Sequence, residues 1–313
     1  MEYFMLAVSV VLPLFVYMLV GVLIKHLGIL GEENLKAVNR MIFNIMIPLA
    51  LFFSVYRADL KSAVKPGLYV YVWVSVIAVF GLVWVFLRRC RLDGAVTATM
   101  VQGMFRSNFV LFGVTIAASL CDERGVASIA ALSAIVVPTF NILTVILFET
   151  ARGGKVPVRK LLIGIFMNPL VGAGVLGIAV GLLEIRIPEL VAEPLEKLGE
   201  AATPLALVVL GGLLSAKSIS GHRYHLAVAA LAKLVVIPFV TVCLGILAGF
   251  RGNDLVAVLA VFASPTAVAS TPMAQAMGGD GKLAGEIVAV TSVGCILTMF
   301  LWVFVLAGVG YIA

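Results

Sequence analysis

The chain has 313 residues, of which 62% are hydrophobic and 12% charged, and its mean hydropathy is +1.16. Soluble domains are about half apolar and about a quarter charged, so this composition excludes an ordinary soluble domain. The formal net charge is +6, but the Lys and Arg residues lie between apolar runs and form no basic face. We therefore expect no nucleic-acid partner, because a cationic excess of this kind is typical of the cytoplasmic loops of membrane proteins.

The apolar residues form runs long enough to cross the hydrocarbon core of a bilayer, which takes about 20 helical residues. The first run has no basic residue ahead of it and no small-residue cleavage site, so we interpret it as a retained helix. The pattern does not show the alternating strands of about 10 residues that an outer-membrane barrel requires. The sequence predicts an all-α integral membrane protein with ten transmembrane helices, at 3–24, 36–56, 67–87, 94–120, 125–149, 159–183, 198–216, 225–249, 255–277 and 283–311.

The basic residues are divided unevenly between the two sets of predicted loops. If the N-terminus is outside, the cytoplasmic loops carry 13 Lys and Arg residues and the outer loops carry 7. Cytoplasmic loops of membrane proteins hold the excess of Lys and Arg. We therefore expect a multi-pass protein of the cell membrane, inner or plasma, with both termini extracytoplasmic.

The two halves of the chain share residues at a nearly constant offset of 156 or 157 positions. Five predicted spans in each half make the second half start on the opposite face, so the repeats must be inverted. Secondary transporters are often built this way, with the site near the midplane. We predict a first repeat at 1–150, a cytoplasmic linker at 151–158 and a second repeat at 159–313. The matches are Pro13 with Pro169, Gly21 with Gly177, Pro48 with Pro204, and Phe105 with Phe262.

The fourth and ninth predicted spans are interrupted in the middle by residues that disfavour a continuous helix. Proline removes a helical N–H donor, and backbone groups freed in a bilayer are tolerated only inside protein or facing water. Ordinary proline kinks are the alternative interpretation. Because the breaks occupy matching positions in the two repeats, we predict a substrate site where they cross. The candidates are Arg106, Ser107 and Asn108 in the first break and Ser264, Pro265 and Thr266 in the second.

Arg106 lies in the middle of its span, where a charge costs at least about 2.5–3.5 kcal/mol unless it is paired or faces water. All 16 acidic residues fall in predicted loops or at span ends, so we infer that an anionic substrate supplies the partner. A guanidinium group binds a carboxylate through two parallel hydrogen bonds. The alternatives are an Arg exposed to water, or one bound to backbone carbonyls or lipid phosphate. Lys233, the other basic residue well inside a span, is expected to extend its ammonium group to the cytoplasmic interface.

Gln102, Asn141 and Asn44 are further candidates for substrate binding, although polar side chains in spans also join helices by hydrogen bonds. The four cysteines match no metal-ligand spacing, and we expect them to pack as small apolar residues. The predicted spans offer no deep Asp pair, metal cluster or nucleophile–base pair. We therefore expect neither an enzyme nor a cofactor, and coupling to H⁺ or Na⁺ stays open.

Several segments, in their order and spacing, resemble the auxin efflux carrier family of membrane transporters. This resemblance covers essentially the whole chain and implies a scaffold domain of helices 1, 2, 6 and 7. Helices 3–5 and 8–10 would form a transport domain that moves like an elevator, with helices 4 and 9 crossing. Asn108 and Pro265 match residues expected to line the site. The segments are Val11–Phe15 through Gly21 to Leu30, Leu35 to Arg40, Phe43–Asn44 with Pro48, Ser107–Phe109 with Gly113, and Ser264–Thr266.

The resemblance implies a carboxylate as substrate: an indole carboxylate in plant members, and malate, malonate and similar anions in bacterial members. Ser107 stands where many relatives have proline, and Arg106 is not standard there, so both depart from the plant pattern. The short linker at 151–158 suggests a prokaryotic-type carrier. A sodium-coupled carrier of the bile-acid symporter type, an ion channel and a substrate sensor are the alternatives. A homodimer through the scaffold is expected by analogy only.

Overall fold

The computed structural model describes residues 2–57, 65–152, 169–183, 185–213 and 223–312. Within these ranges the chain forms helices and no strands, apart from one isolated β-bridge, which confirms the all-α class. Parts of the spans predicted at 159–183 and 198–216, and most of the linker at 151–158, lie outside the described residues.

Five helical segments in the described ranges are long and apolar enough to cross a bilayer. Shorter apolar helices cover Phe15–His26, Gly172–Gly181 and Asn253–Ala263. By length and composition the chain is therefore a membrane protein, and the count of ten spans stays a prediction. The five long segments are Glu32–Phe53, Pro66–Arg89, Glu123–Ala151, Arg223–Leu247 and Gly281–Gly308.

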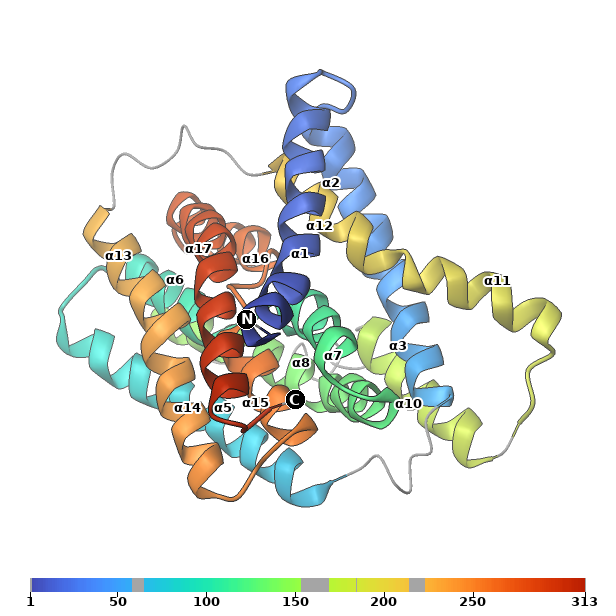
Figure 1. The fold of residues 1–313 in the computed structure, drawn as a ribbon. Coiled ribbons are helices and arrows are strands. Elements are labelled where there is room, and N and C mark those ends of the chain that lie inside the picture. The colour runs from blue at the N-terminus through green and yellow to red at the C-terminus, as the bar shows by residue number, and fades with distance from the viewer. Residues whose placement is uncertain (1, 58–64, 153–168, 184, 214–222, 313) are drawn as a thin grey trace.

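Seven elements pack into one body, called here the α1–α12 group (Figure 1). Within it α1 lies along α12, and α3 lies along α10 and α11. Small residues allow the helices to approach closely: a methyl group at Gly21 would lie 1.8 Å from the Val208 carbonyl oxygen, and one at Gly211 would lie 2.0 Å from that of Met18. The members are α1 (Glu2–His26), α2 (Glu32–Met41), η1 (Ile42–Met46), α3 (Ile47–Tyr56), α10 (Pro169–Leu182), α11 (Glu189–Glu200) and α12 (Ala202–Leu213).

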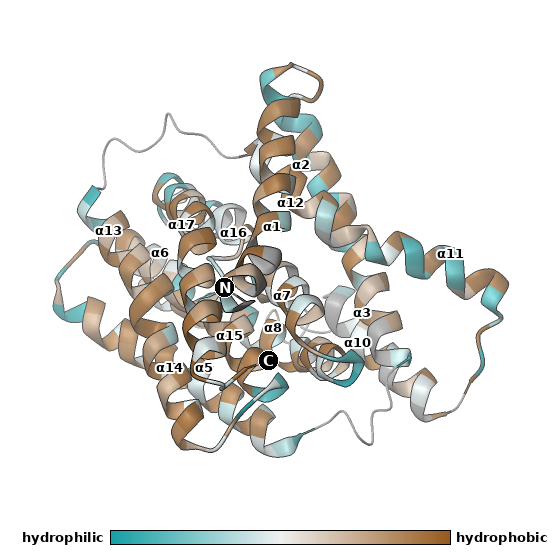
Figure 2. Ribbon diagram, in the orientation of Figure 1, coloured by the Kyte–Doolittle hydropathy of each residue, from teal (hydrophilic) through white to brown (hydrophobic). Residues whose placement is uncertain are grey.

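Helix α11 covers residues 189–197 of the predicted loop between the spans at 159–183 and 198–216, so the expectation of a loop is wrong there, and its last three residues fall within the predicted span. The helix is amphipathic, and polar turns alternate with apolar ones along it (Figure 2). Its acidic side is tied to the end of α3, where Arg57 pairs with Glu189 at 2.9 Å and with Glu196 at 2.9 Å. A surface ion pair of this kind fixes orientation more than it adds stability.

The remaining elements form a second body, called here the crossing group. At its centre α15 is buried at every position from Leu255 to Ala263. Its outer helices, α5 and α14, are largely hydrophobic (Figure 2). They expose large apolar side chains such as Leu82 and Leu247, as a surface in contact with lipid would. The members are α5 (Pro66–Arg89), α6 (Gly94–Phe105), η2 (Phe109–Gly113), α7 (Val114–Leu120), α8 (Glu123–Ala151), α13 (Arg223–Leu231), η4 (Ala232–Val236), α14 (Ile237–Leu247), α15 (Asn253–Ala263), α16 (Ser270–Ala276) and α17 (Gly281–Gly308).

The two groups meet along a limited set of helices. Helix α1 packs on α17, and the rings of Phe4 and Phe300 lie 5.5 Å apart there. On the other side α3 and α10 pack on α8. These contacts form the boundary between the α1–α12 group and the crossing group.

Candidate functional site

Both central helices of the crossing group stop inside the protein. Helix α6 ends at Phe105, and Arg106 is extended, with φ −77° and ψ 125°. Helix α15 ends at Ala263, and Ser264 is extended, with φ −62° and ψ 149°. Pro265 has no N–H to offer the carbonyl of Val261 four residues earlier, so the sequence itself ends α15 at this point.

The two breaks meet and satisfy part of each other's backbone. Ser107 and Thr266 form the isolated antiparallel bridge. The amide of Asn108 donates to the Pro265 carbonyl at 2.7 Å, and the Thr266 hydroxyl donates to the Gly103 carbonyl at 2.6 Å. The Thr266 amide donates to Thr291 Oγ1 on α17 at 3.2 Å. The expected interruption of the two helices, and their juxtaposition, are therefore present in the structure.

Several polar side chains around the crossing are buried without a hydrogen-bond partner among the described residues. Buried polar groups are normally paired, and each exception calls for an explanation such as an absent ligand or water. The set comprises both amide atoms of Gln102, Oγ of Ser107, Nδ2 of Asn108, Oγ of Ser270 and Oγ of Ser292. The Oγ of Ser128 on α8 is also buried without a partner. The backbone carbonyl of the same residue accepts a hydrogen bond from the Tyr69 hydroxyl on α5.

Arg106 directly precedes Ser107 and Asn108 in the chain and is only 5% exposed. Its Nη1 is 2.7 Å from the thioether sulfur of Met273 on α16, and a thioether is a weak acceptor. No carboxylate in the described ranges lies within ion-pairing distance of it. A guanidinium group carries five N–H donors, so most of its hydrogen-bonding capacity is left for another partner.

Two charged residues are buried in the crossing group, and one of them, Lys233, differs from the sequence expectation. Glu286, expected at a span end, lies in the second turn of α17 and is 1% exposed, with Lys282 Nζ 4.0 Å from its carboxylate. Lys233 was expected to reach the interface, and this is wrong: it lies in η4 and is 1% exposed. A π-helical turn widens the helix, and here the turn faces α6, α15 and α17 rather than water.

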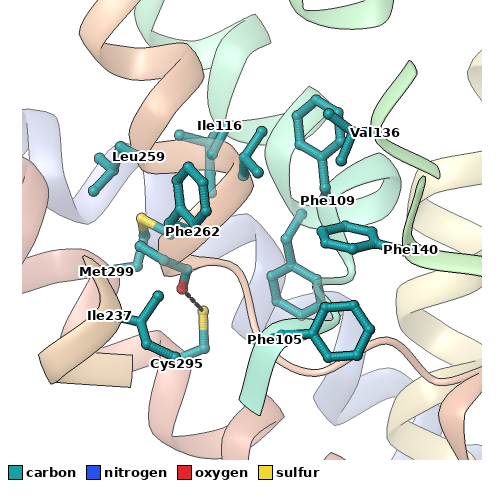
Figure 3. Packing of buried hydrophobic residues seen from close by; sticks show 14 of the residues in the cluster. Phe105, Phe109, Ile116, Val136, Phe140, Ile237, Leu259, Phe262, Cys295 and Met299 are labelled. Carbon is teal, nitrogen blue, oxygen red and sulfur yellow. Dashed lines mark hydrogen bonds between the residues drawn. The ribbon is translucent and has the colours of Figure 1, made fainter. Parts of the chain in front are cut away.

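The crossing is walled by aromatic rings (Figure 3). The ring of Phe105 lies 5.0 Å from that of Phe80 and 5.8 Å from that of Phe140. Phe109 and Phe262 are buried nearby on the two broken segments. Apolar walls exclude water and lower the local dielectric, which strengthens any charge–charge contact made by Arg106.

The structure brings together most of the predicted site residues but not all of them. Gln102, Arg106, Ser107, Asn108, Ser264, Pro265 and Thr266 all lie at the crossing. The Ser264 hydroxyl is already engaged, because it donates to the Ala260 carbonyl at 2.5 Å.

The two other predicted residues lie apart from this set. Asn141 is half-buried on α8, next to Phe140. Asn44 lies on η1 in the α1–α12 group and is exposed.

Met273 and Thr291 contact the crossing, Ser270 lies one turn before Met273, and Ser292 follows Thr291. Sequence reasoning missed all four. Ser270 lies in the second interrupted span, and this position could have marked it as a candidate site residue. Thr291 and Ser292 form an adjacent pair of hydroxyls within an otherwise apolar run, which is the second signal that was available. Within the described residues there is no group of three or more His, Cys, Asp or Glu side chains that could hold a metal ion.

Comparison with known proteins gives one consistent result. Residues 6–303 match the family described as membrane transport protein. The chain is 26% identical to an uncharacterized transporter of Methanothermobacter thermautotrophicus over 310 residues, which is 97% of this chain and 99% of that protein. It is 23% identical to the transporter MJ1031 of Methanocaldococcus jannaschii, over 96% of this chain and 99% of that protein. It is also 23% identical to the transporter YfdV of Escherichia coli K12, over 94% of this chain and 96% of that protein.

Proposed function

Because the chain belongs to the membrane transport protein family, which is that of the auxin efflux carriers, we propose that it carries a small organic anion across the membrane. The proposed site is the crossing of the two broken segments, Arg106–Asn108 and Ser264–Thr266. One observation carries this proposal. A buried guanidinium group without a carboxylate partner in the described ranges lies beside Ser107 and Asn108 and one helical turn from Gln102, and each of these three side chains has a buried polar atom without a partner.

Charge balance favours an anionic substrate over a neutral one. Burying an unpaired cation costs several kcal/mol in proteins after relaxation, and a bound carboxylate would remove much of that cost. A carboxylate can take two N–H donors of Arg106 and a further one from Nδ2 of Asn108. The Gln102 amide and the hydroxyls of Ser107, Ser270 and Ser292 remain for hydroxyl, carbonyl or second carboxylate groups of the substrate.

Movement of the crossing group relative to the α1–α12 group would carry the site across the membrane. This assigns the α1–α12 group to the scaffold domain and the crossing group to the transport domain. The proposal is supported by the close glycine-mediated packing of α1 on α12, which suits a rigid frame. It is also supported by the placement of both breaks, with Arg106, within the other group. The inverted repeat, with its matched breaks, is the sequence pattern expected of such a carrier.

Thermal unfolding of the purified protein in detergent tests the site. Mono- and dicarboxylates, including indole acetate, malate and malonate, would be screened with neutral and cationic analogues of equal size. A ligand at 100 times its Kd stabilises the folded state by about 2.7 kcal/mol. We expect at least one carboxylate to stabilise the wild type, and this response to be lost in Arg106→Gln and reduced in Asn108→Ala.

Arg124→Gln is the matched control, because Arg124 is exposed at the start of α8 and its variant should respond like the wild type. A carboxylate that stabilises Arg106→Gln as much as the wild type would contradict the assigned role of Arg106. Stabilisation by neutral or cationic analogues alone would contradict the anion proposal.

A further inference from the structure

Helix α15 ends inside the protein with carbonyl groups that have lost their helical donors. Pro265 has no N–H for the carbonyl of Val261. The Thr266 N–H donates to Thr291 Oγ1, so the carbonyl of Phe262 also loses its donor. Among the described residues, the carbonyl of Ala263 accepts only from the Cys295 thiol, at 3.7 Å (Figure 3), and a thiol is a weak donor.

The carbonyl end of a helix carries a partial negative charge, and cations stabilise it. At a helix end in water, solvent supplies the missing hydrogen bonds. The end of α15 is sealed instead, because Val261, Ala263 and Ser264 are all 0% exposed. A positive charge close to this point therefore stabilises the helix end.

Lys233 is the cation that lies there. Its helical turn, η4, packs against α15 and α17. Helix α14 directly follows η4, is joined to α15 by the short segment 248–252 and packs along it, so η4 lies near the carbonyl end of α15. The Cys295 thiol contacts the Ala263 carbonyl at that end. Ile237, one turn after Lys233, lies beside Cys295 and Met299 (Figure 3).

The two breaks therefore each have a buried cation, supplied in different ways. After α6 the cation is Arg106, in the chain of the break itself. The position that matches Arg106 at the offset of 157 is Ala263, which carries no charge. Lys233, from a neighbouring span, supplies the cation at the second break.

We propose that the Lys233 ammonium group is a tethered counter-cation for the carbonyl end of α15, in the place where a free monovalent cation such as sodium would otherwise bind. The carrier then needs no sodium ion to keep its second break intact. This inference is independent of the proposed substrate, because stability alone tests it. Removal of the amine, with space left behind, should create a site for a small free cation.

The test compares the wild type, Lys233→Ala and Lys233→Met in detergent at constant ionic strength, with choline, sodium, potassium or methylammonium chloride. We expect the midpoint of thermal unfolding of the wild type to be the same in sodium and in choline. Lys233→Ala should unfold roughly 5–10 °C lower in choline, since an uncompensated buried charge is strongly destabilising. Methylammonium or sodium should restore it in a saturable manner.

Lys233→Met fills the space without a charge, so it should stay destabilised in every salt. Lys36→Ala is the control, because Lys36 and its partner Glu32 are both 60% exposed, and a surface pair of this kind contributes little to stability, so this variant should resemble the wild type throughout. Should Lys233→Ala fail to survive purification in choline, purification with methylammonium applies the same test. The proposal is overturned if sodium saturably stabilises the wild type, if Lys233→Ala is as stable as the wild type, or if no small cation restores it.

Discussion

Ser107 and Thr266 pair as an antiparallel bridge at the point where α6 and α15 are both interrupted. The bridge lets the two breaks satisfy part of each other's backbone, with the Asn108 amide donating to the Pro265 carbonyl. The neighbouring polar side chains are therefore not needed as hydrogen-bond partners for the interrupted backbone. The same contact that holds the crossing together therefore leaves Gln102, Ser107 and Asn108 available to a ligand.

The Thr266 side chain is predicted to hold the two breaks together. In Thr266→Val the Gly103 carbonyl loses the hydroxyl donor at 2.6 Å and stays buried, which should cost about 1–3 kcal/mol of unfolding free energy. Thr298→Val is the control, because its hydroxyl only bonds to carbonyls of its own helix. Denaturant or thermal unfolding measures both variants, and equal effects would contradict the special role of Thr266.

The packing of α1 on α12 should tolerate no side chain at Gly211. An alanine methyl group there would lie 2.0 Å from the Met18 carbonyl oxygen, and backbone cannot yield as a flexible side chain does. We expect Gly211→Ala to destabilise by about 1–3 kcal/mol or more. Gly81→Ala, in the interior of α5 with no atom within 4 Å of the added methyl, should be neutral or stabilising. A folded Gly211→Ala protein of wild-type stability would contradict the close packing.

The helical class and the two helix interruptions could be predicted from the sequence. Proline, glycine and the length of an apolar run affect the backbone where they occur, independently of the rest of the fold. Pro265 and the polar cluster from Gln102 to Asn108 predict the breaks without reference to other parts of the chain. Which atoms remain unpartnered could not be predicted, because it depends on contacts such as that between Thr266 and Thr291. The expectation for Lys233 failed for the same reason: the depth of a residue along a span does not say whether its side chain faces lipid, water or α15.

Helix α11 shows a further limit of the sequence analysis. Its hydrophobic residues are spaced along one face and interrupted by four Glu residues and one proline, Pro194. By composition the segment reads as an acidic loop. Helix α11 is positioned by its packing on α3 and by the ion pairs of Arg57. Both contacts join residues far apart in the sequence, so the local pattern could not predict them.

A cross-link between the two groups should stop transport if the crossing group moves against the α1–α12 group. Phe4 and Phe300 meet across the boundary, with ring centroids 5.5 Å apart. In a background without Cys90, Cys121, Cys243 and Cys295, oxidation of the Phe4→Cys/Phe300→Cys pair should lower flux at least about tenfold, and reduction should restore it.

The matched control is a pair within the crossing group, Tyr71→Cys/Phe250→Cys, whose rings lie 5.1 Å apart. Its oxidation should leave flux within about twofold of the reduced protein. Unchanged flux in the cross-linked Phe4/Phe300 variant would contradict movement between the groups.

The attachment of α11 to α3 should weaken in acid. Hydrogen bonds from Arg57 hold the pKa of the Glu189 carboxyl below its ordinary value of 4.5. A carboxyl with a depressed pKa contributes stability that is present above its unfolded value and lost as the pH falls through its folded value. Amide hydrogen exchange of Glu189–Glu200, corrected for the intrinsic pH dependence, should therefore rise between pH 5 and pH 3.

Glu189→Gln should exchange faster already at pH 7 and show a smaller acid step. Glu193→Gln is the control on the same helix, because the ion pair that Glu193 forms in the described part of the chain is with Lys197 of α11 itself, at 2.6 Å. An acid step of equal size in Glu189→Gln and the wild type would contradict the role of this ion pair.

Counterflow in proteoliposomes tests the central claim most directly. Vesicles loaded with an unlabelled carboxylate that stabilises the protein would take up the labelled compound, with wild type and Arg106→Gln compared at equal amounts of reconstituted protein. The account predicts transient, saturable accumulation in the wild type and at least about a hundredfold slower uptake in Arg106→Gln. Equal uptake by Arg106→Gln, or wild-type flux that rises linearly with concentration and shows no counterflow, would contradict an anion carrier with its site at the crossing.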